Sequence, residues 1–495
     1  MNETSAPAGF KDAFRRKLRA WPAALLLALI VVLALPAAWL VAPAFVSPPP
    51  AARPEVPPWQ QLPATLSARQ GLAPLTASAP VPLPSAVTAQ LETLLKPDGD
   101  GTITGLVQDA LTGQVLFDRG GSEYRIPASN MKLLTAVAAL RALGPGHRFS
   151  TKVLAGPAAN QVVLAGGGDV LLGAGESRPG QVMGHAGLAT LATAAVNALH
   201  AAGTTGELKV FVDDSLFTGP PLNPGWADGD VTAGEVAPVF PLALNSARFD
   251  PAVTTGPRPQ DSAVTTAEAF AAQLKATGAA AGLTVAAGVE RYTPPASTAG
   301  APGGSPAVLA EVQSATVGQQ VDLMLQTSDN YLAEVLGRMT AAAAGEPASN
   351  EGATGAVRAR LADLGVATGT MTLADVSGLA TANQVSARQF VEVVRAITTG
   401  TDARLRAALD GFPVAGLTGT LGSRYGDGGT ARGAGLVRAK TGTLNSVIAL
   451  SGYVVDADGR LLVFSFIGNG LTPGAAGNRD ALDRAATALA ACGCR

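Results

Sequence analysis

Segments that read as β-strands stand at both ends of the globular part of this chain, and helical segments lie between them. Near the start, apolar residues at 102–107 and 114–117 flank the turn residues Thr112-Gly113, which predicts a hairpin. Near the end, further strands are expected at 435–442, 447–455 and 461–467. Because a sheet must bury its apolar face against another layer, this order predicts one sheet assembled from the two termini, with helices packed on it.

The middle of the chain contains two kinds of sequence. Apolar residues recur with helical spacing from Met131 to Leu143, and further helices are expected at 316–345, 354–364, 386–399 and 477–491. Residues 147–310 instead alternate short strands, Ala-rich helices and Gly/Pro loops. Since 495 residues exceed what one ordinary core requires, we expect 147–310 to be an insert with its own core or cores.

The N-terminal segment predicts where in the cell the protein is located. Basic residues between Lys11 and Arg19 precede an apolar run at 21–45, which exceeds the signal-peptide core of about 7–15 residues and suits a spanning helix of about 20. The basic residues would keep 1–20 in the cytoplasm and place the rest outside, anchored in the membrane. Ala42-Pro43-Ala44 also fits a cleavage site, so a secreted form remains the alternative. Residues 46–84, rich in Pro, Ala and Ser, predict an extended linker.

Composition argues against several classes of function. A net charge of −2, without a long basic stripe beyond the N-terminus, argues against nucleic acid as a partner. The three histidines form no HExxH pattern and the sequence has no CxxC pair, so we expect neither a metal centre nor a cofactor. Cys492 and Cys494 are interpreted either as a small disulfide or a lipid or metal contact, or, as we favour, as a non-catalytic tail.

Three short polar motifs carry the candidate chemistry. Ser129-Asn130-Met131-Lys132 opens the helix after Pro127, and its i,i+3 spacing places hydroxyl and amine on one helix face. Ser328-Asp329-Asn330 lies between two helical stretches, and Lys440-Thr441-Gly442-Thr443 ends an apolar strand. Taken alone, each of the first two motifs is better explained by a helix cap or a surface lysine, whereas Lys440 on an apolar strand is harder to explain as a solvated surface charge. Chance rarely places all three, in this order, on a helix start, a loop and a strand.

The motifs SxxK, SxN and KTG in this order are the signature of the serine penicillin-recognising enzymes. The chain resembles in particular the class C low-molecular-mass penicillin-binding proteins, which act as D-alanyl-D-alanine carboxypeptidases and endopeptidases. The segment between Ser129 and Ser328 is far longer than in β-lactamases, which fits the inserted domains of this group. The resemblance covers residues 88–490 and includes the runs Gly166-Gly167-Gly168-Asp169, Pro224-Gly225-Trp226, Ala237-Pro238-Val239, Ser377-Gly378-Leu379 and Pro413-Val414-Ala415-Gly416.

The resemblance implies an α/β (α+β) fold of the penicillin-recognising serine transpeptidase and β-lactamase type, with an antiparallel sheet flanked by helices. Residues 85–146 and 311–495 would form the catalytic domain, with 147–310 inserted into it. The implied substrates are peptidoglycan stem peptides, and β-lactam antibiotics would act as covalent inhibitors. Leu417 departs from the group's pattern, because a polar or charged residue is expected after Gly416.

The same resemblance assigns roles to the first two motifs. Ser129 would attack the carbonyl of the penultimate D-alanine, and Lys132 would accept its proton. A lysine accepts a proton only when neutral, so burial and the nearby charge of Lys440 are expected to lower the pKa of Lys132. Ser328 would relay a proton to the leaving amine, while Asn330 positions Lys132 and the substrate amide.

The third motif would bind the substrate. Lys440, kept charged, suits the terminal carboxylate of the peptide, and Thr441, Gly442 and Thr443 would line the same binding site. Backbone N–H groups of Ser129 and Thr443 would form the oxyanion hole.

The sequence leaves three other interpretations of the function open. A β-lactamase shares the motifs but must deacylate quickly, and the sequence identifies no carboxylate placed to activate that water. A catalytically silent wall-binding or scaffold protein could keep the fold, although the intact motifs argue against this. A Ser-His-Asp hydrolase fits least, because the chain has no GxSxG motif and its histidines all fall within 147–200.

Overall fold

The computed structural model describes residues 75, 77–293 and 306–494. The chain divides into two units, Met1–Ala73 and Pro74–Arg495, and the described residues all belong to the second. The anchor predicted at 21–45 lies outside the described residues. Within the described ranges, no helix is both long enough and apolar enough to span a membrane.

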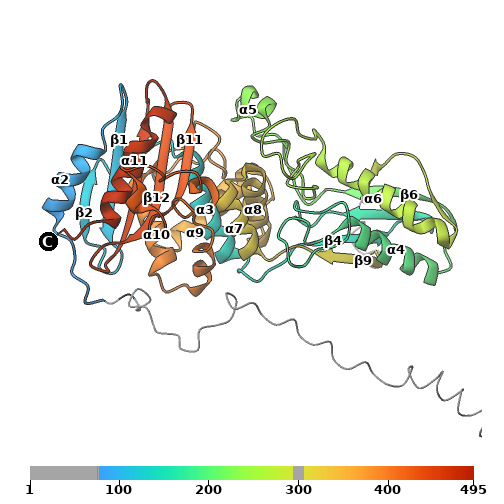
Figure 1. Ribbon diagram of the computed structural model, residues 1–495. Coiled ribbons are helices and arrows are strands. Elements are labelled where there is room, and N and C mark those ends of the chain that lie inside the picture. Colours follow the sequence, from blue (N-terminus) through green and yellow to red (C-terminus); the bar gives the residue numbers. More distant parts are fainter. Residues whose placement is uncertain (1–74, 76, 294–305, 495) are drawn as a thin grey trace, which may run out of the picture. The chain divides into compact units, whose positions relative to one another are not determined.

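A five-stranded antiparallel sheet joins the two ends of the globular chain, as the sequence predicted. Its order is β11-β12-β13-β1-β2, and Figure 1 shows the blue β1 and β2 in one sheet with the red strands. The strands are β1 (Thr102–Asp109), β2 (Val115–Arg119), β11 (Arg438–Leu444), β12 (Val447–Val455) and β13 (Leu461–Asn469). The fold is therefore the α/β arrangement expected, with an antiparallel sheet flanked by helices.

Helices cover both faces of this sheet. On one face, α2 (Pro84–Leu94) and α11 (Ala475–Ala490) pack against each other and against strands β2 and β12. On the other face, α10 (Ala387–Thr398) packs on β1, β12 and β13, and it contacts α3 (Met131–Ala142). The region predicted as helical at 316–345 consists of α7 (Val317–Thr327) and α8 (Asn330–Ala343), with α9 (Asn350–Ala362) following.

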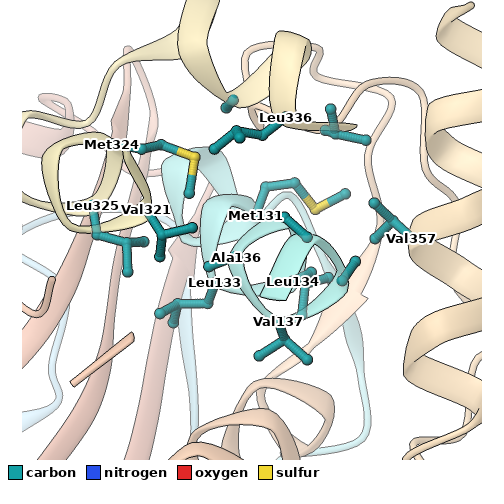
Figure 2. Close-up of a cluster of buried hydrophobic side chains, with 14 of the residues drawn as sticks. Met131, Leu133, Leu134, Ala136, Val137, Val321, Met324, Leu325, Leu336 and Val357 are labelled. Carbon is teal, nitrogen blue, oxygen red and sulfur yellow. The ribbon is translucent and has the colours of Figure 1, made fainter. Parts of the chain in front are cut away.

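Helix α3 is the buried centre of the helical layer. Every residue from Met131 to Leu140 is buried, because α7, α8, α9 and α10 all contact this helix. Figure 2 shows the cluster, in which the side chains of α3 meet those of the surrounding helices, including Val321, Met324, Leu336 and Val357. The first turn of α3, which carries Lys132, is thereby fixed from several sides.

A second sheet occupies the middle of the chain. Its order is β7-β6-β5-β4-β9, with β8 (Glu290–Arg291) paired to β6. Two helices, α4 (Leu188–Ala201) and α6 (Ser262–Gly278), bury their apolar sides in its separate hydrophobic cluster. The strands are β4 (Ser150–Ala155), β5 (Gln161–Ala165), β6 (Gly206–Asp213), β7 (Leu283–Val285) and β9 (Val308–Gln313). We call residues 147–313 the insert, because β9 extends it three residues beyond the boundary expected at 310.

The C-terminal cysteines are part of the packed structure. Cys492 and Cys494 form a disulfide, and both are buried in the cluster shared with α2 and α11. The carbonyl of Cys494 accepts a hydrogen bond from Leu83 N at 2.7 Å. The tail therefore joins the start of α2 to the end of α11.

Candidate active site

The turn that carries Ser129 is a short 3₁₀ helix, Ala128–Asn130, directly before α3. Its first residue, Ala128, has a left-handed φ of 47°, a conformation that costs an L-residue about 1 kcal/mol or more. The turn is held to the sheet by Asn130, whose Nδ2 donates to Ser451 Oγ on β12 at 2.6 Å. Ser129 is thus fixed where α3 meets the sheet.

Strand β11 approaches this turn closely because it has a glycine there. A side chain added at Gly442 would lie 2.9 Å from the Pro127 carbonyl oxygen and 3.1 Å from Ser129 N. Such distances exclude an ordinary Cβ contact. The glycine of the KTG motif therefore lets the strand lie against the backbone of the SxxK serine.

Lys132 is fully buried and its amine is surrounded by oxygen atoms. Its Nζ lies 2.9 Å from Ser129 Oγ, 2.5 Å from Asn330 Oδ1 and 2.7 Å from the Ser377 carbonyl oxygen. Burial lowers the pKa of Lys132 to about 8, against the opposing effect of nearby carboxylates, of which Asp375 is the strongest. A substantial neutral fraction is therefore available at mildly basic pH, as a proton acceptor requires.

The SxN motif lies at the junction of two helices. Ser328 ends α7 in the left-handed conformation, with φ 59°. Asp329 caps α8 by accepting from Leu332 N at 3.0 Å. Asn330 begins α8, and its Nδ2 donates to the Glu235 carbonyl at 3.0 Å. The amide of Asn330 thus links Lys132 to a residue of the insert.

Lys440 is the second fully buried lysine of the site. Its Nζ donates to Ser328 Oγ at 3.0 Å and to the Thr441 carbonyl at 2.7 Å. Burial first, and then the charge of Lys132, hold the pKa of Lys440 well below its ordinary value. From the sequence, we expected Lys440 to stay charged and to lower the pKa of Lys132. In the structure the charge of Lys132 instead lowers the pKa of Lys440, while nearby carboxylates raise the pKa of Lys132 against the larger effect of burial.

The remaining residues of the third motif lie along β11. Thr441 is buried and its Oγ1 lies 2.7 Å from Thr420 Oγ1, whereas Thr443 is exposed at the strand edge. The three motifs therefore meet: Lys132 contacts Ser129 and Asn330, Lys440 contacts Ser328, and Gly442, between Thr441 and Thr443 on β11, lies against the backbone of Ser129.

Two buried carboxylates behind Lys132 were not singled out from the sequence as site residues. Asp375 accepts from the Gly378 and Ala380 N–H groups at 2.8 and 2.7 Å and from Trp226 Nε1 at 2.9 Å. Glu334 Oε1 accepts from Ser377 N at 2.9 Å, and burial raises the pKa of Glu334 to about 7. The two side chains fix the loop whose Ser377 carbonyl holds Lys132. The run Ser377-Gly378-Leu379 was the only sequence signal for this loop.

The arrangement supports acyl transfer to a serine. A hydroxyl next to a buried amine of lowered pKa is an activated nucleophile. Ser328 and Lys440 supply a second hydroxyl and a second amine, 3.0 Å from each other. In the described part of the chain, no three His, Cys, Asp or Glu side chains are grouped so that they could hold a metal ion. Fold and site together define a serine penicillin-recognising enzyme.

The chain belongs to the D-Ala-D-Ala carboxypeptidase 3 (S13) family, which matches residues 87–284 and 257–490. It is 37% identical over 429 residues to a carboxypeptidase of Mycobacterium tuberculosis, covering 86% of this chain and 88% of the relative. It is 36% identical to carboxypeptidase DacB of Mycolicibacterium smegmatis, covering 87% and 90%. The fold resembles penicillin binding protein 4 of Haemophilus influenzae, with a TM-score of 0.62, 23% identity, and coverage of 81% of this chain and 98% of that one.

Proposed function

We propose that this protein is a serine-type D-Ala-D-Ala carboxypeptidase that acts on peptidoglycan stem peptides through an acyl-enzyme on Ser129. The observation that carries the proposal is the 2.9 Å contact between Ser129 Oγ and the buried Nζ of Lys132. DD-endopeptidase action is a second candidate, because both reactions break a bond after a D-alanine and the same serine would serve both.

Acylation follows from this contact. The neutral amine of Lys132 takes the Ser129 proton as Oγ attacks the carbonyl carbon of the penultimate D-alanine. The tetrahedral intermediate then collapses, the C–N bond breaks, and the proton that Lys132 took from Ser129 passes through Ser328 to the leaving amine. Water hydrolyses the resulting ester and returns free Ser129 with the shortened peptide. Asn330 keeps the Lys132 amine directed at the serine, since its Oδ1 accepts from Nζ.

The terminal carboxylate of the peptide suits the third motif. Its negative charge would raise the pKa of Lys440, whose ammonium, once formed, would further lower the pKa of Lys132 by repulsion. Substrate binding would thus favour the proton on the lysine that binds and remove it from the lysine that acts as base. We infer that the backbone N–H groups of Ser129 and Thr443 form the oxyanion hole, where losing one donor typically costs about 2.7–4 kcal/mol of barrier.

The cellular setting belongs to the same proposal. We infer that the enzyme works outside the cytoplasm, carried by a membrane anchor at 21–45 and a linker at 46–84. We also infer that 147–310 is a domain inserted into the catalytic domain. β-Lactam antibiotics, which resemble the D-Ala-D-Ala terminus and carry a carboxylate, would acylate Ser129.

The test is the intact mass of the full-length protein after incubation with benzylpenicillin, compared with Ser129→Ala. We expect a persistent adduct of one penicillin on the unaltered chain and none on the variant, followed by release of D-alanine from a stem pentapeptide. Rapid turnover of the drug would instead identify a β-lactamase. No adduct and no turnover would favour a silent wall-binding protein.

Cleavage of a cross-linked peptide dimer separates endopeptidase from carboxypeptidase action.

A further inference from the structure

The insert holds three consecutive residues of the SxN region. Asp329, the second residue of the motif, forms an ion pair with Arg248 of the insert at 2.9 Å. Asn330, the third, donates a hydrogen bond from its side-chain amide to the Glu235 carbonyl at 3.0 Å. The tyrosine that follows, Tyr331, accepts from Phe240 N at 3.0 Å and lies 2.9 Å from Ser262 Oγ. The insert therefore contacts the catalytic motif itself and not only its surroundings.

The ion pair between Arg248 and Asp329 is buried. The Asp329 side chain is fully inaccessible and that of Arg248 is 8% exposed. The contact is a charge pair without hydrogen-bond alignment, since Asp329 Oδ2 has no hydrogen-bond partner among the described residues. Removing one member of such a pair leaves the other as an unpaired buried charge, which is strongly unfavourable.

Asp329 is placed between the two residues that contact the lysines. On one side, Ser328 Oγ accepts from Lys440 at 3.0 Å. On the other, Asn330 Oδ1 accepts from Lys132 at 2.5 Å. A shift of Asp329 would therefore move both of these contacts, because the three residues are consecutive and Ser328 already occupies a left-handed conformation.

The charges around Asp329 connect it to the proposed base. Asp329 raises the pKa of Lys132, as do Asp375, Glu334 and Glu235, all against the larger lowering by burial. On the insert side, Arg258 stands near the same carboxylate: Asp329 raises the pKa of Arg258 and Arg248 lowers it, while burial dominates. Arg258 itself is tied to backbone, donating to the Ser246 carbonyl at 2.8 Å, so Arg248 is the cation in direct contact with Asp329.

We propose that Arg248 is a positioning residue for acylation: through its buried ion pair with Asp329, the insert fixes the SxN motif between Lys132 and Lys440. Arg248 touches neither lysine and has no chemical step of its own. The inference rests on the proposed function. It assigns the insert a direct part in building the catalytic site, separate from any influence on which peptide can enter.

The test measures the second-order rate constant of benzylpenicillin acylation on the full-length protein with single and paired substitutions. Arg248→Met removes the charge and keeps most of the side-chain length, and we expect the rate to fall roughly 10- to 100-fold, because small displacements of catalytic groups have effects of that size. Arg248→Lys keeps the charge and should recover much of the rate. Arg360→Met, which breaks the exposed ion pair to Asp363 on α9, is the matched control and should leave the rate unchanged.

The paired variant separates positioning from a general loss of stability. Arg248→Met combined with Asp329→Asn leaves no unpaired buried charge, so it should react faster than Arg248→Met alone. Because a carboxylate that raises the pKa of Lys132 has been removed, the rate of the paired variant should also reach half its maximum at a lower pH than wild type. If Arg248→Met does not fold, the paired variant and Arg248→Lys provide the comparison.

The outcomes are distinguishable. A wild-type chain without any penicillin adduct would defeat the proposed function and this inference together. A reactive wild type with Arg248→Met equally reactive would overturn the inference alone. The same holds if Arg248→Met is slow but neither Arg248→Lys nor the paired variant recovers any rate, because Arg248 would then act only as a packing residue.

Discussion

At the scale of single residues, the site depends on two buried lysines in different surroundings. Lys132 lies among carboxylates that partly offset the effect of burial on its pKa. The pKa of Lys440 is lowered by burial first and then by the positive charge of Lys132. The free enzyme therefore binds a proton more readily on Lys132, and under the proposed function the substrate carboxylate would supply a counter-charge to Lys440.

The pH dependence of acylation follows from the first lysine. Lys132 has its pKa lowered to about 8, so its neutral, proton-accepting form is scarce below that pH and predominates above it. We expect the rate constant for benzylpenicillin acylation to rise with pH and to reach half its maximum near pH 8, since this parameter reports the free enzyme. Stopped-flow measurements between pH 6 and 10 would check it. A rate independent of pH across this range would remove Lys132 from the role of base.

Glu334→Gln provides the control for this assignment. Glu334 has a pKa raised to about 7, so it is mostly ionised at pH 8, where its charge raises the pKa of Lys132. The amide keeps an oxygen for the Ser377 N–H and removes the charge. The midpoint of the pH profile should therefore move to lower pH, and a shift to higher pH would contradict the electrostatic account.

The sequence identifies the reacting residues more readily than the residues that hold them in position. Ser129, Lys132, Ser328 and Lys440 are recognisable because their motifs have fixed short spacings. Glu334 and Asp375 act through contacts that exist only after folding: each accepts backbone N–H groups of a loop that no local pattern assigns to Lys132. Burial, which decides the direction of both lysine pKa shifts, is likewise a property of the assembled fold.

At the scale of elements, the junction of α7 and α8 is where the helix prediction lacked detail. The sequence predicts helices over 316–345, with the SxN motif in a loop between two helical stretches, but it does not show how the first helix ends or how the second begins. The structure has a single left-handed residue, Ser328, followed by Asp329 as the cap of α8. A C-terminal left-handed residue is normally glycine, and a serine there fits the need for a hydroxyl at this point.

Ser328→Gly should separate these two requirements. Glycine adopts positive φ without the cost of about 1 kcal/mol that an L-residue bears, so the melting temperature of Ser328→Gly should be higher than that of Ser328→Ala, which loses the same contact with Lys440. Loss of the hydroxyl should slow catalysis about 100-fold or more, as expected for a proton-transfer group. Ser328→Ala is the control, because it loses the hydroxyl but keeps the strain. Thermal scans and D-alanine release, measured on wild type and both variants, separate the effect on stability from the effect on catalysis. An active glycine variant would exclude Ser328 from proton transfer to the leaving amine.

At the scale of the whole molecule, the five-stranded sheet was predictable and the position of the insert was not. Strands at both ends of the chain restrict the sheet to few arrangements. By contrast, the insert packs its own helices on its own sheet and also adds side chains to the main cluster around α3 and α8, among them Trp226, Val236 and Val239. Such contacts between distant parts leave no periodic signal in the sequence.

This shared cluster predicts that the insert and the catalytic body unfold together. Trp226 joins them most directly, because it is 6% exposed and its Nε1 donates to Asp375 at 2.9 Å. Trp226→Phe keeps an aromatic ring and leaves the buried carboxylate short of a donor, which should cost about 1–3 kcal/mol. Calorimetry of the full-length protein should show one main transition in both proteins, at a lower temperature in the variant.

The effect of Trp226→Phe distinguishes cooperative unfolding of the whole protein from independent unfolding of the insert. If the insert unfolded by itself, calorimetry would show two transitions, and Trp226→Phe would move only the one that belongs to the insert. Leu199→Ala makes the comparison, because Leu199 is buried solely in the insert's own cluster. With cooperative unfolding both substitutions lower the same single transition, since removing a buried leucine side chain costs about 2–5 kcal/mol of whichever unit contains it.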